Sequence, residues 1–416
     1  MSKLGLSQKP GLKLAAANPA RASGSSARVH PGNELEVSVV LPCLNEAETV
    51  ATCVRKAIAA LQKLAIDGEV IVVDNGSADG SRELARAAGA RVVSEPRRGY
   101  GSALIRGFEE AGAPYIIMAD ADDSYDLSDL EPFVSGLRQG ADLVMGSRRR
   151  GTIKPGAMPW HHRWIGNPVL SGILNFFFDG EVSDAHCGMR GVSKDAYRRM
   201  RLQATGMEFA SEMVVKASLG GMSIAEVPIT LHRDGRKRRP HLRSFRDGWR
   251  HLRFMLLLSP THLFVLPGLI CMLLGILPLI ALGGGPMRIG AFSFDIHYMI
   301  LGSLLTILGY QIVTTGLFAK VYSHSHRLYA PDRALNLIRR YFNLERGLIT
   351  GGLTFLVGFL IDAVILDHWL SSGMGSLNAV RPALQASTLM IIGAQTVCAS
   401  FFLAVLDLST PEEAPG

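Results

Sequence analysis

The chain has few of the residues that build disulfide frameworks or zinc sites. Its five cysteines are scattered through 416 residues, with no Cys-x-x-Cys pair and no spacing typical of metal ligands. We therefore expect reduced thiols in a cytoplasmic protein. The N-terminus lacks an apolar h-region, so we expect no cleavable signal peptide. Residues 1–33 are rich in Ala, Gly, Ser and basic residues and are expected to form a disordered tail.

Charged residues are also scarce, at 19% of the chain against 48% hydrophobic residues. The scarcity is local, because charges are spread through residues 34–253 and long apolar runs begin after Phe254. Four runs of about 20 residues can each cross ~30 Å of hydrocarbon. They cover about 262–282, 297–319, 348–366 and 387–407. We predict a transmembrane region over 259–407 and a tail over 408–416, since one water-soluble domain rarely buries four such helices.

Basic residues are unevenly placed around these runs. The connection 320–347 carries six Lys and Arg residues, whereas 283–296 and 367–386 carry one each. The positive-inside rule then predicts that the first domain and both termini are cytoplasmic. Nine more basic residues lie between Arg233 and Arg253. We interpret 233–258 as a juxtamembrane segment that is attracted to anionic lipid, sets the topology, or does both. We expect no nucleic-acid partner.

The first domain has the pattern of a parallel sheet. Short apolar strands are predicted at 36–41, 69–73, 91–94 and 115–118, and helices at 45–64, 79–88 and 101–112. Alternating strands and helices are typical of βαβ units. Ligands bind beyond the carboxyl ends of the strands in such sheets. Four acidic residues occupy those ends, namely Glu46, Asp74, Asp120 and Asp122. We expect the binding site at this edge.

The strongest local signal is the sequence Asp120-Ala121-Asp122 after a buried strand. Two carboxylates at this spacing can share one divalent cation, and Mg²⁺ or Mn²⁺ prefers such oxygen ligands. A bound cation would neutralise charge on a departing nucleotide diphosphate. The alternative is a solvated acidic loop or a helix N-cap.

Two further motifs occupy the ends of the first two strands. They are Pro42-Cys43-Leu44-Asn45-Glu46 and the segment Val73–Gly80. With the acidic pair, they resemble the family-2 inverting glycosyltransferases of the GT-A fold. The resemblance implies an α/β, Rossmann-like, mostly parallel sheet over 34–232, followed by the four transmembrane helices. It further implies that Pro42, Leu44, Glu46 and Asp74 line the nucleoside pocket, and that Asp120 and Asp122 hold metal and diphosphate. Without it, Asn45-Glu46 reads as a helix start and Asn75-Gly76 as a tight turn.

Three more motifs look like the dolichol/polyprenyl-phosphate mannose or glucose synthase group, over about residues 36–250. They are Arg97–Ala103, Gly146-Ser147-Arg148 and Asp184–Arg190. The resemblance implies a GDP-mannose or UDP-glucose donor, with Gly101 at the donor site, and a polyprenyl phosphate acceptor. It places Arg148 and Arg190 at the lipid phosphate, and it adds Arg233 and Arg238 from the basic loop. Arginine suits phosphate oxygens, although either Arg148 or Arg190 can instead form a structural salt bridge.

The sequence departs from that group at several positions. Ser124 stands where a Gln is usual, which leaves a third metal ligand open, and His186-Cys187 replaces Thr-Ser. Glu208 and Glu212 lie one helical turn apart. A phosphate acceptor is already anionic and needs no base, so we expect these two carboxylates to support other residues or simply to lie on a helix face.

The resemblance predicts inverting transfer of mannose or glucose to a polyprenyl or dolichyl phosphate, for cell-envelope glycan or glycoprotein synthesis. Asp122, Arg148 and Arg190 would form its catalytic centre. One alternative is a processive polysaccharide synthase, which resembles this chain but carries a Gln-x-x-Arg-Trp motif that is absent here. Another is a non-catalytic, lipid-carrier-binding membrane protein. The presence of Asp120 and Asp122 argues against it, because a non-catalytic protein has no need of the acidic pair. The four helices would either assemble copies of the chain into a homo-oligomer or only anchor it.

Overall fold

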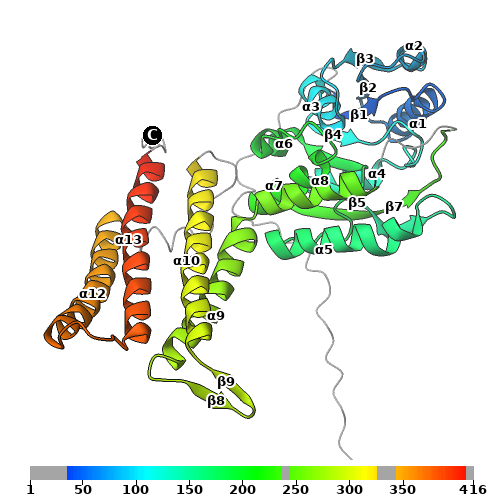
Figure 1. Ribbon diagram of the computed structural model, residues 1–416. Helices are drawn as coiled ribbons and strands as arrows, with labels where there is room; N and C mark the ends of the chain where they lie inside the picture. The colour runs from blue at the N-terminus through cyan, green and yellow to red at the C-terminus, as the bar shows by residue number, and fades with distance from the viewer. Residues whose placement is uncertain (1–34, 237–243, 326–342, 409–416) are drawn as a thin grey trace, which may run out of the picture. The chain divides into compact units, whose positions relative to one another are not determined.

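The computed structural model describes residues 35–236, 244–325 and 343–408 (Figure 1). The predicted tail at 1–33, Arg238 and most of the basic connection 320–347 lie outside the described residues.

Seven strands form the sheet of the first domain. They are β1 (Val37–Cys43), β2 (Gly68–Asp74), β3 (Arg91–Ser94), β4 (Tyr115–Met118), β5 (Leu143–Ile153), β6 (Arg190–Ser193) and β7 (Ile224–Leu231). Their order across the sheet is β3-β2-β1-β4-β6-β5-β7. The neighbours in β3-β2-β1-β4 and the pair β5-β7 are parallel, while β6 runs antiparallel to β4 and β5. The predicted mostly parallel, Rossmann-like sheet is confirmed.

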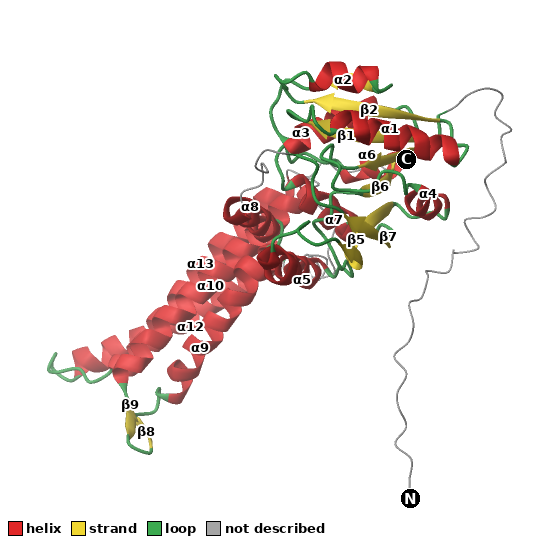
Figure 2. Cartoon of the chain, turned by 90° about the vertical axis from the view of Figure 1, so that its right-hand side faces the viewer, coloured by secondary structure: helices red, strands yellow, loops and turns green. Residues whose placement is uncertain are grey.

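Helices cover both faces of this sheet (Figure 2). They are α1 (Val50–Lys63), α2 (Ser81–Ala87), α3 (Tyr100–Glu110), α4 (Glu131–Arg138), α5 (Asn167–Phe178), α6 (Lys194–Met200) and α7 (Phe209–Leu219). Alternate residues of a strand point to opposite faces. Accordingly Val39 and Leu41 join the core cluster under α1 and α4, and Val40 joins the cluster under α3 and α7. Strands buried on both faces read as continuous apolar runs, which is why the sequence revealed them.

The first helix begins later than its pattern predicts. Asn45 has a left-handed backbone, with φ of 57°, and α1 starts at Val50 instead. The amide of Asn45 donates to Ser77 Oγ at 2.9 Å, and the amide of Glu46 donates to Ser81 Oγ at 2.8 Å. The two motif loops thus bind each other, and Asn45-Glu46 forms an irregular loop rather than the first turn of a helix.

The remaining elements begin with α8 (Ser244–Leu257) and the π-helix η3 (Thr261–Val265). They continue with α9 (Leu266–Ala281), the hairpin β8 (Met287–Ile289) and β9 (Phe292–Phe294), α10 (Ile296–Ser325), α12 (Leu344–Ser371) and α13 (Val380–Leu408). Among the residues that the structure describes, four segments are long and apolar enough to cross a membrane. They are Thr261–Ala281, Ile296–Ser323, Leu344–Ser371 and Val380–Leu406.

These apolar helices pack as the pairs α9–α10 and α12–α13, with α10 against α13. Small residues allow close approach, since a Cβ on Gly309 would lie 2.4 Å from the backbone nitrogen of Met272. Hydroxyl groups join α10 to α13, with Ser303 Oγ 2.7 Å from Thr388 Oγ1. Ser303 and Thr388 thus satisfy each other's hydroxyl groups between the two helices, as a lipid environment favours.

Candidate active site

A cavity of about 370 Å³ lies at the carboxyl ends of the parallel strands. Pro42 lines it from the end of β1, Leu44 and Glu46 from the loop after β1, and Asp120 and Asp122 from the loop after β4. We call this cavity the donor pocket. It contains five of the residues for which the resemblance implies donor or metal binding.

The two carboxylates of the acidic pair are held by hydrogen bonds. Tyr100 donates its hydroxyl to Asp120 Oδ1 at 3.0 Å, and the amide of Ser124 donates to Asp122 Oδ1 at 3.0 Å. Burial, and then the charge of Asp122, raise the pKa of Asp120 to about 7. A divalent cation would relieve this repulsion, and paired carboxylates suit Mg²⁺ or Mn²⁺. In the described ranges, no third His, Cys, Asp or Glu side chain joins this pair in a group that could hold a metal ion.

Arg236 lies directly over this acidic pair. Its guanidinium contacts Asp122 Oδ2 and donates to Glu46 Oε1 at 3.0 Å. The loop that carries it is fixed by the amide of Gly235, which donates to the carbonyl oxygen of Asp122 at 3.0 Å. Arg236 therefore joins the two motif loops of the donor pocket by charge.

Two residues for which donor contacts were implied have other partners. Asp74 is 1% exposed, and its carboxylate accepts from the amides of Gly76 and Ser77, at 3.2 and 3.1 Å. Asp74 thus stabilises its own turn and does not line the donor pocket. Gly101 does not line it either, but a Cβ there would lie 2.0 Å from the carbonyl oxygen of Ala204. Only glycine permits that contact between α3 and the loop before α7.

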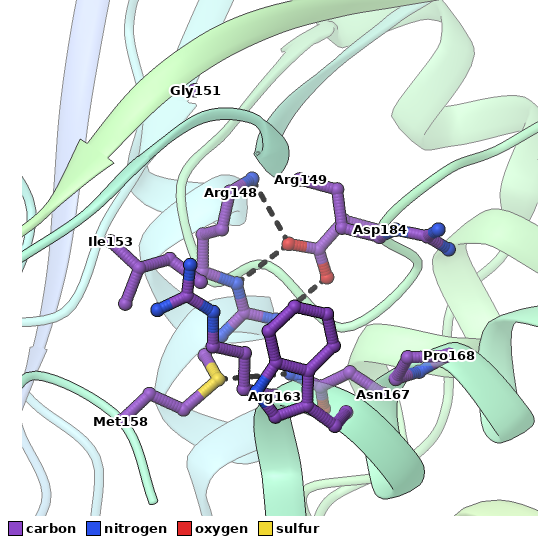
Figure 3. A pocket seen from close by; sticks show the side chains of 10 residues that line it. Arg148, Arg149, Gly151, Ile153, Met158, Arg163, Asn167, Pro168 and Asp184 are labelled. Carbon is purple, nitrogen blue, oxygen red and sulfur yellow. Dashed lines mark hydrogen bonds and ion pairs between the residues drawn. The ribbon is translucent and has the colours of Figure 1, made fainter. Parts of the chain in front are cut away.

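A second cavity, of about 190 Å³, lies between β5 and the N-terminal end of α5 (Figure 3). Its cationic residues are Arg148, Arg149 and Arg163, and Asp184 lies beside Arg148. Arg163 lies over the ring of Trp164, 5.3 Å from its centroid. Three arginines around one small cavity suit an anionic group. We call this cavity the arginine pocket.

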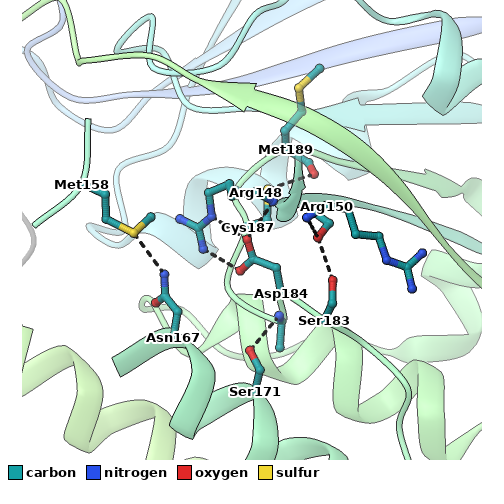
Figure 4. Close-up of polar contacts among 12 residues, drawn as sticks. Arg148, Arg150, Met158, Asn167, Ser171, Ser183, Asp184, Cys187 and Met189 are labelled. Atoms are coloured by element: carbon teal, nitrogen blue, oxygen red, sulfur yellow. Dashed lines mark hydrogen bonds and ion pairs between the residues drawn. The ribbon is translucent and has the colours of Figure 1, made fainter. Parts of the chain in front are cut away.

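Asp184 orients Arg148 in this pocket (Figure 4). Arg148 Nε donates to Asp184 Oδ2 at 2.6 Å, and Nη2 donates to Oδ1 at 2.7 Å. Burial alone would raise the pKa of Asp184, but the hydrogen bonds and charge of Arg148 outweigh it and lower that pKa. The salt-bridge alternative therefore holds for Arg148, although the same side chain also lines the arginine pocket.

One loop joins the two pockets. The segment 184–190 begins at Asp184 in the arginine pocket, and its Gly188 reaches the acidic pair of the donor pocket. A Cβ on Gly188 would lie 2.6 Å from Asp120 Oδ2. The amide of Gly188 donates to the hydroxyl of Tyr125 at 2.8 Å. Glycine thus allows this loop to pass against the acidic pair.

Arg190 does not reach either pocket. It is completely buried, and its guanidinium donates to the carbonyl oxygens of Cys187, Ala210 and Ala185 at 2.8, 2.6 and 2.9 Å. These bonds hold the 184–190 loop against α7, so the expected phosphate contact is replaced by a structural role. Arg233, the other described basic-loop candidate, is exposed and lines neither pocket.

The two glutamates of α7 differ in their surroundings. Glu212 is 3% exposed, accepts from the amides of Gln203 and Ala204 at 3.0 and 2.8 Å, and pairs with Lys216 at 2.8 Å. It therefore supports another part of the chain, the loop that packs on Gly101. Glu208 precedes α7, and its Oε2 is buried without a hydrogen bond in the described structure.

Several lining residues were not singled out from the sequence. Arg98 and Tyr100 enter the donor pocket beside the implied Gly101. Arg246, Asp247 and Arg250 enter it from α8. The basic residues between Arg233 and Arg253 were interpreted only from the apolar runs that follow them. The position of each residue around the helix was the signal that could have separated residues facing the pocket from residues facing lipid.

The sequence matches the family of glycosyl transferase family 2 over residues 38–201, and the family-2 C-terminal transmembrane region over residues 317–407. A hexosyltransferase of low-salt glycan biosynthesis from Haloferax volcanii, Agl6, is 40% identical over 388 residues, covering 91% of this chain and 93% of the relative. The chain belongs to glycosyltransferase family 2. The predicted family and fold are confirmed, and the non-catalytic alternative is set aside because this integral membrane protein is a glycosyltransferase.

Two other relatives match this family-2 glycosyltransferase over about half of its length. A dolichyl-phosphate hexose transferase from Haloferax volcanii is 32% identical over 204 residues, covering 47% of this chain and 82% of the relative. The glucosyl-3-phosphoglycerate synthase of Mycobacterium tuberculosis, solved with Mg²⁺ and uridine diphosphate, is 24% identical, covering 53% of this chain and 78% of that chain at a TM-score of 0.43.

Proposed function

We propose that this glycosyltransferase moves a hexose, mannose or glucose, from a nucleotide-sugar to a polyprenyl phosphate at the cytoplasmic face of a membrane. The observation that carries the proposal is the 184–190 loop, which runs from the arginine pocket to the acidic pair of the donor pocket. Gly188 lies against Asp120, and Asp184 holds Arg148. The nucleotide-sugar and its cation would occupy the donor pocket, and the acceptor phosphate would occupy the arginine pocket. The similarity to a dolichyl-phosphate hexose transferase supports this acceptor class.

The reaction follows from this arrangement. A phosphate oxygen held by Arg148, Arg149 and Arg163 attacks the anomeric carbon on the side opposite the diphosphate. The bond from that carbon to the diphosphate oxygen breaks, and the nucleoside diphosphate leaves with the electron pair. Mg²⁺ or Mn²⁺ at Asp120 and Asp122 would supply charge stabilisation to this leaving group. The acceptor is already ionised, so alignment and electrostatics provide the catalysis and the anomeric configuration inverts.

An apolar surface near the arginine pocket supports a lipid acceptor. Trp160 and Trp164 are each 69% exposed, and Val169 and Phe176 of α5 are also exposed. Tryptophan is common where proteins meet the headgroups of a bilayer. The ring of Phe177 stacks on His262, at 4.5 Å, where the first apolar span begins. The contact links α5 to the start of a span, which would bring the arginine pocket to the depth of lipid phosphates.

The test uses the purified full chain in lipid nanodiscs with polyprenyl phosphate and Mn²⁺. Radiolabelled GDP-mannose and UDP-glucose are supplied in separate reactions, and label is measured in the organic phase. We expect label from one donor, its loss with EDTA, and its loss in Asp122→Asn. The matched control is Asp129→Asn, which changes an exposed carboxylate in the same segment and should retain activity.

The product distinguishes the remaining alternatives. Nuclear magnetic resonance of the anomeric proton should show the configuration opposite to that of the donor. Label in an organic-insoluble polymer, formed without added polyprenyl phosphate, would instead support a processive synthase. Nucleotide-sugar binding without any lipid label would overturn the phosphate acceptor.

A further inference from the structure

The juxtamembrane helix α8 is fastened to the catalytic domain by one of its faces. Asp247, His251 and Met255 follow one another at four-residue spacing and are all buried. Met255 belongs to the hydrophobic cluster that contains Phe209 and Met213 of α7. Helix α8 contacts both α7 and α5. Because these three side chains are buried against the catalytic domain, the rotation of α8 about its axis is fixed.

A hydrogen-bonded group fixes the rotation and position of α8 more sharply. Ser211 Oγ lies 2.8 Å from Nδ1 of His251 and 3.2 Å from Nε2 of His186. The two imidazole rings meet edge to face, with centroids 4.6 Å apart. His186 belongs to the 184–190 loop that joins the two pockets. The membrane-proximal helix is therefore tied to the same loop that positions Arg148.

The adjacent face of α8 presents two arginines to the donor pocket. Arg246 and Arg250 lie one helical turn apart and both line that pocket. Their side chains are 55% and 42% exposed. The carboxylate paired with them is Asp247, whose Oδ1 lies 3.8 and 3.9 Å away, beyond hydrogen-bond length. Both guanidinium groups can therefore exchange solvent for a ligand without losing a close ion pair.

The donor pocket is lined by side chains of both charges, and Arg236 already pairs with Glu46 and Asp122 on the sheet side. Its four carboxylates are Glu46, Asp120, Asp122 and Asp247. Its four arginines are Arg98, Arg236, Arg246 and Arg250. Three of the carboxylates follow β1 and β4, whereas two of the arginines come from α8. A divalent cation on the side of the three sheet carboxylates and phosphate oxygens near the two arginines of α8 would fit this lining.

We propose that Arg246 and Arg250 bind the diphosphate of the donor, so that the juxtamembrane helix completes the donor pocket. The inference rests on the proposed function in taking the donor to be a nucleotide-sugar. The planar guanidinium binds phosphate oxygens in a two-point geometry, and its delocalised charge is less strongly hydrated than an ammonium. The acidic pair would reach the diphosphate through the cation, and the two arginines would contact it directly.

The experiment measures nucleotide binding by the full chain in nanodiscs, without acceptor, using GDP and UDP each with Mn²⁺. The variants are Arg246→Gln and Arg250→Gln. Arg253→Gln is the matched control, since Arg253 is exposed on the same helix and does not line the pocket. Loss of a charged hydrogen bond to phosphate should raise the Kd of the preferred nucleotide about 10- to 100-fold in each variant. Arg253→Gln should bind like the wild type, and Arg250→Lys should recover part of the loss.

A second ligand tests the assignment to the diphosphate. The corresponding nucleoside, without phosphates, should bind the wild type and Arg250→Gln equally. Unchanged GDP and UDP binding in both glutamine variants would overturn the inference. It would also be overturned if the variants raised only the KM for polyprenyl phosphate and left nucleotide binding unchanged. If the variants lose nucleotide affinity while the wild type labels no lipid, the inference stands and the acceptor of the proposed function fails. Unaltered thermal unfolding of the variants excludes misfolding as the cause of a loss.

Discussion

Arg148 and Asp184 form a two-point ion pair in which both partners are nearly buried. The guanidinium Nε and Nη2 donate to the two carboxylate oxygens at 2.6 and 2.7 Å, and the backbone amide of Arg148 donates to Oδ2 at 3.1 Å. The side chains are 10% and 2% exposed. The pair leaves Nη1 of Arg148 for a ligand of the arginine pocket.

Removing the carboxylate should both destabilise the domain and disorient Arg148. We expect Asp184→Asn to lower the free energy of unfolding by about 3–5 kcal/mol, because a buried arginine loses its counter-charge. The KM for polyprenyl phosphate should rise while the KM for the nucleotide-sugar stays near its wild-type value. Steady-state kinetics with each substrate varied in turn would measure the split. Asp195→Asn, in an ion pair whose carboxylate is 80% exposed, should cost less than about 1 kcal/mol. A selective rise in the donor KM would contradict the assignment.

Arg236 should compete with the metal ion for the acidic pair. Its guanidinium contacts Asp122 and Glu46 and is 12% exposed. We expect Arg236→Gln to bind Mn²⁺ more tightly than the wild type in the absence of nucleotide, because one cation is removed from the carboxylates. Electron paramagnetic resonance of free Mn²⁺ would measure the Kd. Arg233→Gln, which changes an exposed arginine of the same loop, is the control. Weaker Mn²⁺ binding in Arg236→Gln would show that Arg236 organises the carboxylates rather than competing for them.

Acid should loosen the attachment of α8. Burial lowers the pKa of His251 to about 4 and that of His186 well below its usual value. The charged groups near them include Asp247, Glu208, Asp184, Arg190 and Arg148. The unfolded chain takes up protons near pH 6.5 and the folded domain does not. The contribution of these neutral histidines to the free energy of unfolding is therefore fully present above pH 6.5. It is lost as the pH drops from 6.5 towards 4, and the loss for His251 is about 3 kcal/mol.

Unfolding of the wild type and His251→Gln across this pH range measures the effect. The variant should be less stable at pH 7.5, because Ser211 loses the nearer of its two imidazole partners, and its stability should depend less on pH. Equal pH dependence in the two proteins would assign the acid sensitivity to other groups.

Gly101 should resist substitution for a steric reason. A Cβ at this position would lie 2.0 Å from the carbonyl oxygen of Ala204, in the loop that leads to Gly206 and Met207 of the donor pocket. We expect Gly101→Ala to cost about 1–3 kcal/mol and to weaken nucleotide binding as the loop moves. Gly172→Ala, in α5 with nothing within 4 Å of the new Cβ, should be neutral or slightly stabilising. Calorimetric nucleotide titration and thermal unfolding measure both effects.

The parallel half of the sheet could be predicted because its signals are local. Strands such as β1 and β2 are apolar runs that end at polar loops, and the sequence shows both features directly. The acidic pair was found for the same reason, since Asp120 and Asp122 follow β4 at the predicted edge. Helix α1 starts later than expected because Asn45 is held by Ser77, a contact between segments 32 residues apart.

The roles of individual arginines could not be predicted from their motifs. Arg148 and Arg190 look alike in sequence, each at the end of a conspicuous motif. Packing of α7 surrounds Arg190 with backbone carbonyl oxygens, whereas Arg148 stays at a cavity. Similarly, the basic residues of α8, before the apolar spans, lie on different faces of that helix. Only the docking of α8 determines that Arg250 lines the donor pocket and that Arg253 does not.

The direction of β6 changes where chemistry is found along the chain. In an antiparallel strand such as β6, the first residue rather than the last lies at the edge of the sheet where the parallel strands end. Arg190 opens β6, and the segment before it carries Gly188 to Asp120 and Asp184 to Arg148. Insertions just upstream of β6 would therefore alter the distance between the donor pocket and the arginine pocket, while insertions just downstream would emerge at the opposite edge of the sheet and leave that distance intact.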